Sequence, residues 1–417
     1  MTPLDLVKLA LYLNLHLANS LKASLPSASH SSPFTNATIS HKPDPGSESR
    51  LGFSRAYSLS LSPQLIYTRS NLLPALISSK VYQQLEFLAV GSWWIYDGHS
   101  GKGIGQDDNV SGSNSADPPS RLQRIPGGRE DVFGDTSIDL RSTRALMRFL
   151  KLAADVESHP AILEQWGEKP FPEFLTAHVK IPTPLQPPLL ALTSSPDQPA
   201  VTTTSYALPR IHRHLTSIGV FGPGFGSVMP RWGGLAEVAQ VACRALAVGG
   251  GVYVLNNGVE SIRDTRQQFL DNETSSPDDT APPLRVRLDD GEEIWTHWIV
   301  GNLCDLPSEH RSSPDHTSVQ TAHIISIVSS PLSSLFPLPS EGSPPPAGAL
   351  VVYPTASLSA DKRPPVYLMV HSSDTGECPA GQCESQLISL TILAACQVFA
   401  FMMIQRRILI YIVCNIH

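Results

Sequence analysis

Stretches with a regular hydrophobic pattern alternate along the chain with stretches that lack one. Apolar residues recur every three or four positions, as in an amphipathic helix, at residues 62–77, 136–159, 171–179, 205–217 and 235–248. Runs rich in β-branched and aromatic residues predict strands at residues 86–96, 252–256, 319–329, 349–353 and 365–371. Asp290-Gly291, between the apolar runs 285–288 and 293–300, is typical of a β-hairpin turn. Helices and strands are mixed, which favours an α/β or α+β class with at least two layers.

Polar, proline-rich stretches separate these segments. The 37 prolines and 28 glycines make up about 16% of the chain, above the usual total of roughly 12%. Such stretches bury too little apolar surface to offset the entropy cost of ordering, so we expect disorder at residues 20–50, 106–123, 183–204, 271–283 and 307–346. The chain is long enough for two packed domains, repeatedly interrupted.

Charge and the chain ends exclude some classes of protein. The 30 Lys and Arg against 37 Asp and Glu give a formal net charge of −7, unlike a nucleic-acid-binding protein. The six irregularly spaced cysteines suit a reducing compartment. An early apolar patch, residues 9–17, is interrupted by polar residues and is a weak secretory signal. The late apolar run 387–404, followed by Arg406 and Arg407, meets the lower length bound for a membrane span, about 17 residues.

Motifs for catalysis and metal binding are weak. Asp374-Thr375-Gly376 has the form of an aspartic protease motif, but the second copy that this chemistry needs is absent from the sequence. A turn with an Asx-type hydrogen bond is the better interpretation. Cys378 and Cys383 lack the spacing and the second pair of a zinc site. The sequence therefore predicts no catalytic residue, no metal site and no cofactor.

One helical segment carries a basic stripe. Arg144 lies at helical spacing with other basic residues, opposite an apolar face. The others are Arg141, Arg148 and Lys151. A stripe of this kind is usually a solvated face, and the residues alone predict nothing more.

Several sequence blocks resemble, in the same order, those of one protein family. Residues 124–133, RIPGGREDVF, and 146–150, LMRFL, are similar to a block of the Rab escort proteins, the component A subunits of Rab geranylgeranyltransferase. Residues 230–237, PRWGGLAE, resemble a block that these proteins share with the Rab GDP-dissociation inhibitors. Residues 57–96 and 371–382 are similar to two further blocks. Several independent blocks in order are more specific than any single motif.

The resemblance implies a non-catalytic protein with a fold similar to a flavoprotein monooxygenase. A large sheet-containing domain would bind the Rab GTPase, and a small helical domain would shelter the geranylgeranyl lipid. The implied Rab contacts are Glu237, Gln240 and Arg244, although Arg244 could instead form an ion pair within its own helix. The implied contacts to the transferase α subunit are Phe133 and Arg144.

The resemblance also implies a function. Such a protein binds GDP-bound Rab GTPases, presents them to the transferase α/β heterodimer for double geranylgeranylation of their C terminus, and delivers them to membranes. It is cytoplasmic, with transient membrane contact. A Rab GDP-dissociation inhibitor that recycles prenylated Rabs is the alternative, and a membrane-anchored aspartic hydrolase using Asp374 is a remote one.

Domain boundaries follow from the same resemblance. The large domain is expected at 57–105 and 220–382, with disordered inserts at 271–283 and 307–346. The small helical domain is expected at 124–219, and a linker at 106–123 precedes it. The family opens with a strand, a glycine turn and a helix that the sequence before residue 57 does not match. We therefore interpret 1–56 as a disordered or aberrant tail, the large domain as incomplete, and 383–417 as an aberrant apolar segment. An incomplete or mis-spliced reading frame would explain both ends.

Overall fold

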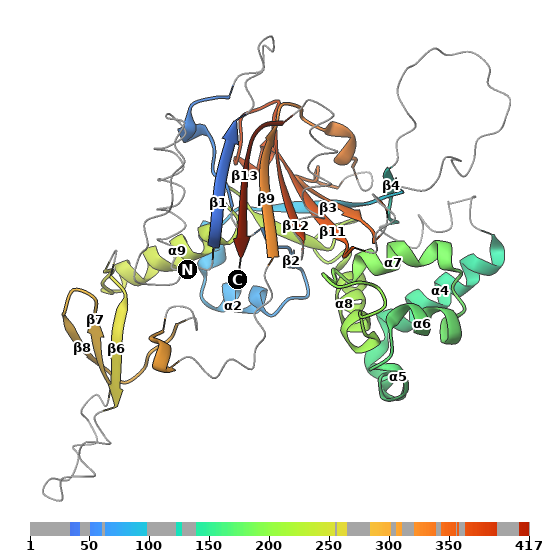
Figure 1. Cartoon of the computed structure of the whole chain (residues 1–417), viewed down its shortest axis with the longest axis horizontal. Helices are drawn as coiled ribbons and strands as arrows, with labels where there is room; N and C mark the ends of the chain where they lie inside the picture. The colour runs from blue at the N-terminus through green and yellow to red at the C-terminus, as the bar shows by residue number, and fades with distance from the viewer. Residues whose placement is uncertain are drawn as a thin grey trace, which may run out of the picture.

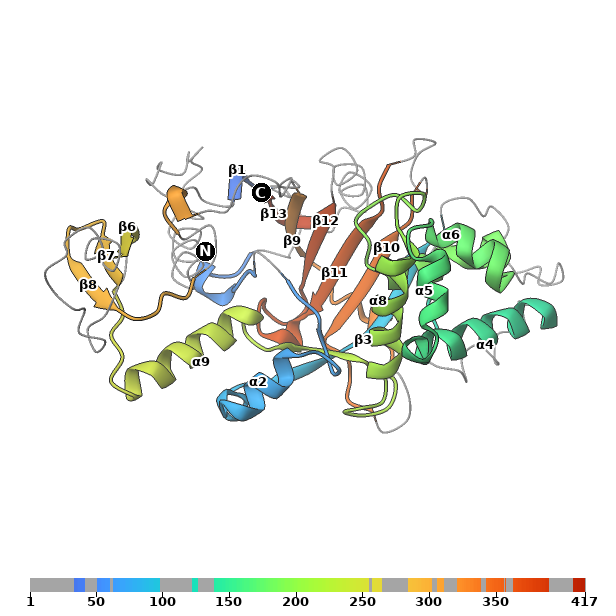
Figure 2. The same ribbon diagram turned by 90° about the horizontal axis from the view of Figure 1, so that it is seen from below.

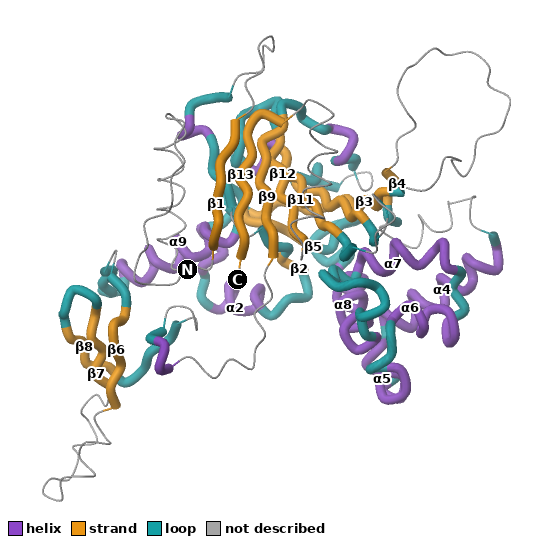
Figure 3. Tube along the Cα trace, viewed as in Figure 1, coloured by secondary structure: helices purple, strands orange, loops and turns teal. Residues whose placement is uncertain are grey.

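The computed structural model describes residues 34–41, 51–60, 63–97, 122–126, 139–254, 257–264, 284–301, 306–310, 321–338, 343–355, 357, 363–389 and 408–416. Within them, a large sheet carries a helical region on one side, while a small three-stranded sheet lies apart on the other (Figure 1). Figure 3 shows that the strands gather in the large sheet and that the helical region beside it contains helices and loops. The mixed helix and sheet class expected from the sequence is confirmed.

The large sheet has ten strands in the order β1-β13-β9-β12-β11-β10-β3-β5-β2, with β4 paired to β3. They are β1 (Phe34–His41), β2 (Ile66–Tyr67), β3 (Phe87–Tyr96), β4 (Leu122–Arg124), β5 (Ser227–Pro230), β9 (Thr321–Val328), β10 (Gly348–Tyr353), β11 (Val366–Ser372), β12 (Cys383–Ser389) and β13 (Ile408–Ile416). Strand β3 pairs in parallel with β10, whereas β11, β12 and β9 pair antiparallel in turn. All six residues of β10 are buried, which explains its uninterrupted apolar sequence.

The helical region packs on the β3, β10 and β11 part of the sheet. It consists of α4 (Leu140–Ala154), α5 (Pro160–Trp166), α6 (Phe171–Phe174), which continues into the π-helix η4 (Leu175–Val179), α7 (Gln186–Leu192) and α8 (Thr204–Ser217). Phe149 of α4 and Ile211 of α8 are fully buried, and the same apolar core includes Met369 of β11. The side chain of Asp139 caps α4, because its Oδ2 accepts hydrogen bonds from the N–H groups of Arg141 and Ser142 at 3.0 and 3.1 Å.

Two further helices and a small sheet complete the described structure. Helix α2 (Leu72–Ser78) and the start of α9 (Leu235–Val248) pack near β5 through an apolar cluster. The small sheet consists of β6 (Val259–Asp264), β7 (Leu284–Leu288) and β8 (Glu293–Thr296). Gly291, with φ 88°, forms the turn between β7 and β8, so the predicted hairpin is confirmed.

Several sequence predictions are wrong in detail. The insert 307–346, expected to be disordered, contains β9, a buried interior strand of the large sheet. The helix expected over 62–77 begins only at Leu72, because Ile66 and Tyr67 pair with β5 as a short strand. Residues 251–254 form no strand. The stretch 183–204, expected to be disordered, contains α7, whose Leu189 and Leu192 are buried in the helical core.

Strands also occupy both ends of the chain, where a tail and an aberrant segment were expected. Phe34–His41 pairs antiparallel with Ile408–Ile416 at the edge of the large sheet, and Cys383–Ser389 is an interior strand between β11 and β9. The apolar run 387–404 therefore begins as the end of a buried strand, and residues 390–407 lie outside the described residues. Among the helices that the structure describes, none is long and apolar enough to cross a bilayer.

Candidate interaction surfaces

A tight turn at residues 231–234 leads from β5 into α9. The backbone N–H of Trp232, a residue with φ 77°, donates a hydrogen bond to the carbonyl of Thr375 at 2.8 Å. Gly376 has φ 78°, and a Cβ there would lie 2.3 Å from the Trp232 indole. Both the backbone conformation and the close approach therefore require glycine at 376. This contact fixes the start of α9 to the loop that follows β11.

Arg231 braces the same turn. Its Nη1 lies 2.9 and 3.0 Å from the two carboxylate oxygens of Glu86, and its guanidinium lies 4.4 Å from the centre of the Trp232 ring. Its backbone N–H also donates to the Glu86 carbonyl at 2.9 Å. Because both side chains are partly exposed, the ion pair contributes at most about 1 kcal/mol, and its main effect is to hold the turn in place.

Helix α9 carries the three residues that the resemblance assigns to Rab contact. Glu237, Gln240 and Arg244 are three and four positions apart and so share one face. Gln240 and Arg244 are exposed, whereas Glu237 is half-buried, and this burial raises the pKa of its carboxyl group. Gln240 Nε2 donates to Glu237 Oε1 at 3.4 Å. Within the described part of the chain Arg244 forms no ion pair, so the alternative of a salt bridge inside the helix is not realised.

The outer half of α9 is largely exposed, although the segment that follows the helix folds back against it, since the Gly251 N–H donates to the Leu246 carbonyl at 2.8 Å. The helix is mostly apolar, yet none of its residues is buried. Leu246 is 55% exposed and Val248 is 85% exposed, and the exposed apolar surface continues at Val252 and Val254. Figure 2 shows α9 projecting from the large sheet toward the small one. Large exposed apolar patches often mark interaction sites.

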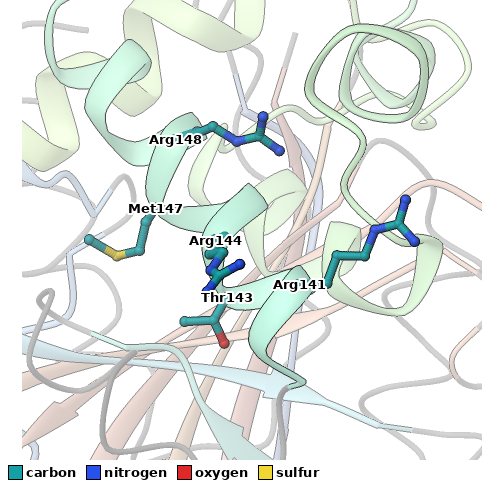
Figure 4. Close-up of a pocket in the computed structure, with 5 residues that line it drawn as sticks. All are labelled: Arg141, Thr143, Arg144, Met147 and Arg148. Atoms are coloured by element: carbon teal, nitrogen blue, oxygen red, sulfur yellow. The ribbon is translucent and has the colours of Figure 1, made fainter.

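The outer face of α4 is basic, as the sequence predicts. The helix buries Phe149 and Ala153 on one side and exposes its basic residues on the other: Arg141, Arg144, Arg148 and Lys151. Side chains of this helix line a shallow surface pocket, in which the three guanidinium groups are spread along the helix (Figure 4). No ion pair joins these arginines to a described carboxylate. They are available to bind acidic groups of another protein. Phe133, the other residue assigned to transferase contact, lies outside the described residues.

One pocket lies between the helical region and the sheet. Leu190 of α7 and Tyr367 of β11 are among its lining residues, and the Tyr367 hydroxyl donates to the carbonyl of Ser195 at 2.7 Å. Its volume is about 110 Å³, below the roughly 300–1,000 Å³ of typical ligand sites. The aromatic side chains of the neighbouring core are fully buried. Shelter for a lipid in this region therefore stays a prediction.

The Asp374 motif forms a turn. Asp374 is exposed on the 3-10 turn η9 (Ser373–Thr375), and its backbone N–H donates to Ser372 Oγ at 3.3 Å. The turn interpretation is thus confirmed, although the capping acceptor is the serine hydroxyl that precedes the turn.

A buried polar cluster next to this turn was not predicted from the sequence. His371 and Glu384 are direct partners in the pairing of β11 with β12, and Glu377 follows the turn. His371 Nδ1 lies 2.5 Å from Glu377 Oε2, and the three side chains are at most 1% exposed. The signal that could have found the cluster is the strand register, which brings positions 371 and 384 together.

The fold is similar to that of a solved Rab GDP-dissociation inhibitor. A crystal structure of a Rab GDP-dissociation inhibitor from Plasmodium falciparum superposes with a TM-score of 0.54 over 84% of this chain and 71% of that chain, at 16% identity. The fold class expected from the sequence is therefore confirmed.

Comparison with curated sequences finds Rab escort proteins among the proteins similar to this chain. The chain is 25% identical over 329 residues to "Rab proteins geranylgeranyltransferase component A" of Saccharomyces cerevisiae, covering 79% of this chain and 47% of that protein. It is 26% identical over 341 residues to the protein of the same name from Candida albicans, covering 81% and 47%. It is also 26% identical to "Rab escort protein 1" of Arabidopsis thaliana, covering 65% and 50%. The resemblance to Rab escort proteins is confirmed, and the chain spans about half the length of these curated relatives. No family model matches.

Proposed function

We propose that this chain is a Rab escort protein. It binds GDP-bound Rab GTPases, presents them to the Rab geranylgeranyltransferase heterodimer for double geranylgeranylation, and delivers them to membranes. In this role it is a non-catalytic accessory subunit that acts in the cytoplasm and contacts membranes transiently. The large domain, 57–105 and 220–382, would bind the Rab, and the helical domain, 124–219, would bind the transferase and the geranylgeranyl lipid.

The observation that carries the proposal is the polar stripe on α9, of which Gln240 and Arg244 are exposed and Glu237 is half-buried. Glu237, Gln240 and Arg244 lie on a helix that is anchored at its first turn and has no buried residue. The guanidinium of Arg244, which has no ion-pair partner among the residues that the structure describes, is suited to bind a carboxylate or a backbone carbonyl of a partner. The same helix belongs to the sequence block that resembles both escort proteins and Rab GDP-dissociation inhibitors.

A reciprocal pair of charge reversals tests the two surfaces. Arg244→Glu on α9 and Arg144→Glu on α4 change the net charge equally and both replace exposed arginines. We expect Arg244→Glu to weaken binding of a GDP-loaded Rab by about tenfold or more and to leave transferase binding unchanged. Arg144→Glu should do the opposite. Arg148→Glu, one turn further along α4, is the control for Rab binding, and circular dichroism melting confirms that each variant is folded.

The outcomes separate the competing functions. If the chain binds Rab but never binds the transferase heterodimer, and instead extracts prenylated Rab from vesicles, it acts as a Rab GDP-dissociation inhibitor. If wild-type chain binds neither Rab nor transferase in calorimetry, the proposal is overturned. Equal loss of Rab binding in Arg244→Glu and Arg148→Glu would reject α9 as the Rab-binding surface and indicate a general charge effect.

A further inference from the structure

The histidine–glutamate cluster consists of the buried side chains of His371, Glu377, Glu384 and Gln386. It lies next to the loop after η9, whose Gly376 contacts Trp232. His371 and Glu384 face each other across β11 and β12, and Gln386 follows two positions later on the same face. Exposure of all four side chains is 1% or less. The segment 51–60 covers this end of the sheet, since the Ser58 N–H donates to the Glu377 carbonyl at 3.0 Å.

The cluster has more hydrogen-bond acceptors than donors. Glu377 Oε2 contacts His371 Nδ1 at 2.5 Å, and Gln386 Nε2 donates to Glu384 Oε1 at 2.6 Å. Four other atoms of the cluster have no partner in the described part of the chain. They are His371 Nε2, Glu377 Oε1, Glu384 Oε2 and Gln386 Oε1. Buried polar atoms in native proteins are almost always paired, so a further group is needed to satisfy this set.

A divalent cation would balance the charge of the cluster. Two ionised carboxylates carry a charge of −2, which a divalent ion neutralises. One ligand atom from each of His371, Glu377 and Glu384 lies within 4.8 Å of the others. Ligands about 2.0–2.2 Å from one Zn²⁺ ion lie roughly 3.3 Å apart, so the side chains would have to move toward a common centre by about an ångström to bind it. An imidazole nitrogen with two carboxylate oxygens is a donor set that suits Zn²⁺. We propose that His371, Glu377 and Glu384 form a structural Zn²⁺ site.

Protonation is the competing explanation. Burial and the neighbouring Glu377 carboxylate raise the pKa of Glu384 well above its usual range. A proton on Glu384 would neutralise one carboxylate and supply a single donor, which leaves most of the unpaired acceptors unsatisfied. Zn²⁺ neutralises both carboxylates and can also engage the imidazole nitrogen.

The site would support the proposed Rab-binding surface without being part of it. Glu377 follows Gly376 directly, and Gly376 contacts Trp232 at the start of α9. Tyr57 also reaches this loop, because its hydroxyl donates to Gln382 Oε1 at 2.9 Å. A metal ion would therefore hold together β11, β12 and the loop after η9, to which the segment 51–60 is hydrogen-bonded. The inference stands on buried residues alone and is independent of the proposed function.

Zn²⁺ content and thermal stability test the proposal. The full-length chain, with any affinity tag removed, is dialysed against EDTA, equilibrated with Zn²⁺, desalted and analysed by mass spectrometry for metal. We expect an equimolar amount of Zn²⁺ and a melting temperature about 3 °C higher when free Zn²⁺ is near 100 times its dissociation constant. Glu384→Gln should lose both effects, whereas Glu164→Gln, on the exposed surface of α5, should keep them.

Other outcomes of these measurements would contradict the Zn²⁺ site. If the wild-type chain retains no Zn²⁺ and its melting temperature does not respond to the metal, the proposal is overturned. Glu384→Gln mimics a protonated carboxyl group. If its melting temperature then equals or exceeds that of wild type, a proton on Glu384, and not a metal ion, neutralises the cluster. Co²⁺ absorption of the wild-type chain is the second measurement, because it needs no variant to fold. A d–d band that Zn²⁺ abolishes supports the site, and its absence rejects it.

Discussion

The contact between Gly376 and Trp232 makes a quantitative prediction about the loop after β11. In Gly376→Ala the new Cβ would lie 2.3 Å from the Trp232 indole, and the backbone would keep φ 78°. A non-glycine residue in this region costs about 1–2 kcal/mol, and forcing an extra carbon into a packed contact costs a further 1–3 kcal/mol. We expect the free energy of unfolding to fall by about 2–5 kcal/mol.

Gly381 in the same loop is a matched control. Its φ is 82°, and a Cβ there would have nothing within 4 Å. Gly381→Ala therefore introduces the same backbone strain without a steric contact, and its cost should be only about 1–2 kcal/mol. Urea unfolding followed by tryptophan fluorescence and by circular dichroism measures both variants.

A double variant isolates the steric term. In a Trp232→Ala background the indole is absent, so Gly376→Ala should cost no more than Gly381→Ala. The coupling between positions 376 and 232 should then be about 1–3 kcal/mol. If Gly376→Ala and Gly381→Ala destabilise equally, or if removing the indole does not relieve Gly376→Ala, the close contact does not determine the conformation of the loop.

Other predictions concern the helical region and α9. Burial lowers the pKa of His214 to about 4, so its neutral form is favoured in the folded state. Stability should be fully present above pH 6.5 and fall by about 3 kcal/mol as the pH drops from 6.5 to 4. Urea unfolding across this range should show a shallower decline for His214→Phe, and an unchanged slope would contradict the assignment. Phe149→Ala should cost about 3–5 kcal/mol in the same assay, while its exposed neighbour Arg148→Ala should change stability by at most about 0.5 kcal/mol. Ala242→Gly, exposed in mid-α9, should cost about 1 kcal/mol of helix stability. Amide hydrogen exchange should detect this loss locally while global unfolding stays the same, and a uniform increase in exchange would refute it.

Hydrophobic pattern predicted the elements that have one exposed and one buried face. In α4 the apolar residues Leu146 and Phe149 alternate with exposed arginines, and the bounds of α9 were predicted to the residue. Strand β12 was missed because Glu384 and Gln386, which are polar, are buried inside the sheet. A sequence pattern assigns such residues to the surface, and only the pairing with β11 and β9 shows otherwise.

The candidate surfaces were predictable to different degrees for a related reason. The stripe of Glu237, Gln240 and Arg244 depends on helical spacing within one element, which the sequence displays directly. The cluster of His371, Glu377 and Glu384 depends on a strand register and on a loop that folds back, so no local spacing indicates it. Residues brought together by tertiary pairing are invisible to motif searches, whatever their chemistry.

The anchoring of α9 relates these two sites to each other. The helix is held at Leu235, which packs against the apolar cluster near β5, and at Trp232, which packs on Gly376. Glu237 lies next to this anchor, whereas Arg244 lies two turns further out on a segment with no buried residue. Changes in the loop that carries Glu377 should therefore be transmitted to α9 through this anchor, because Gly376 contacts Trp232 just before the first turn of the helix. Arg244 should keep its exposure, and the orientation of the whole stripe should shift as one rigid helix.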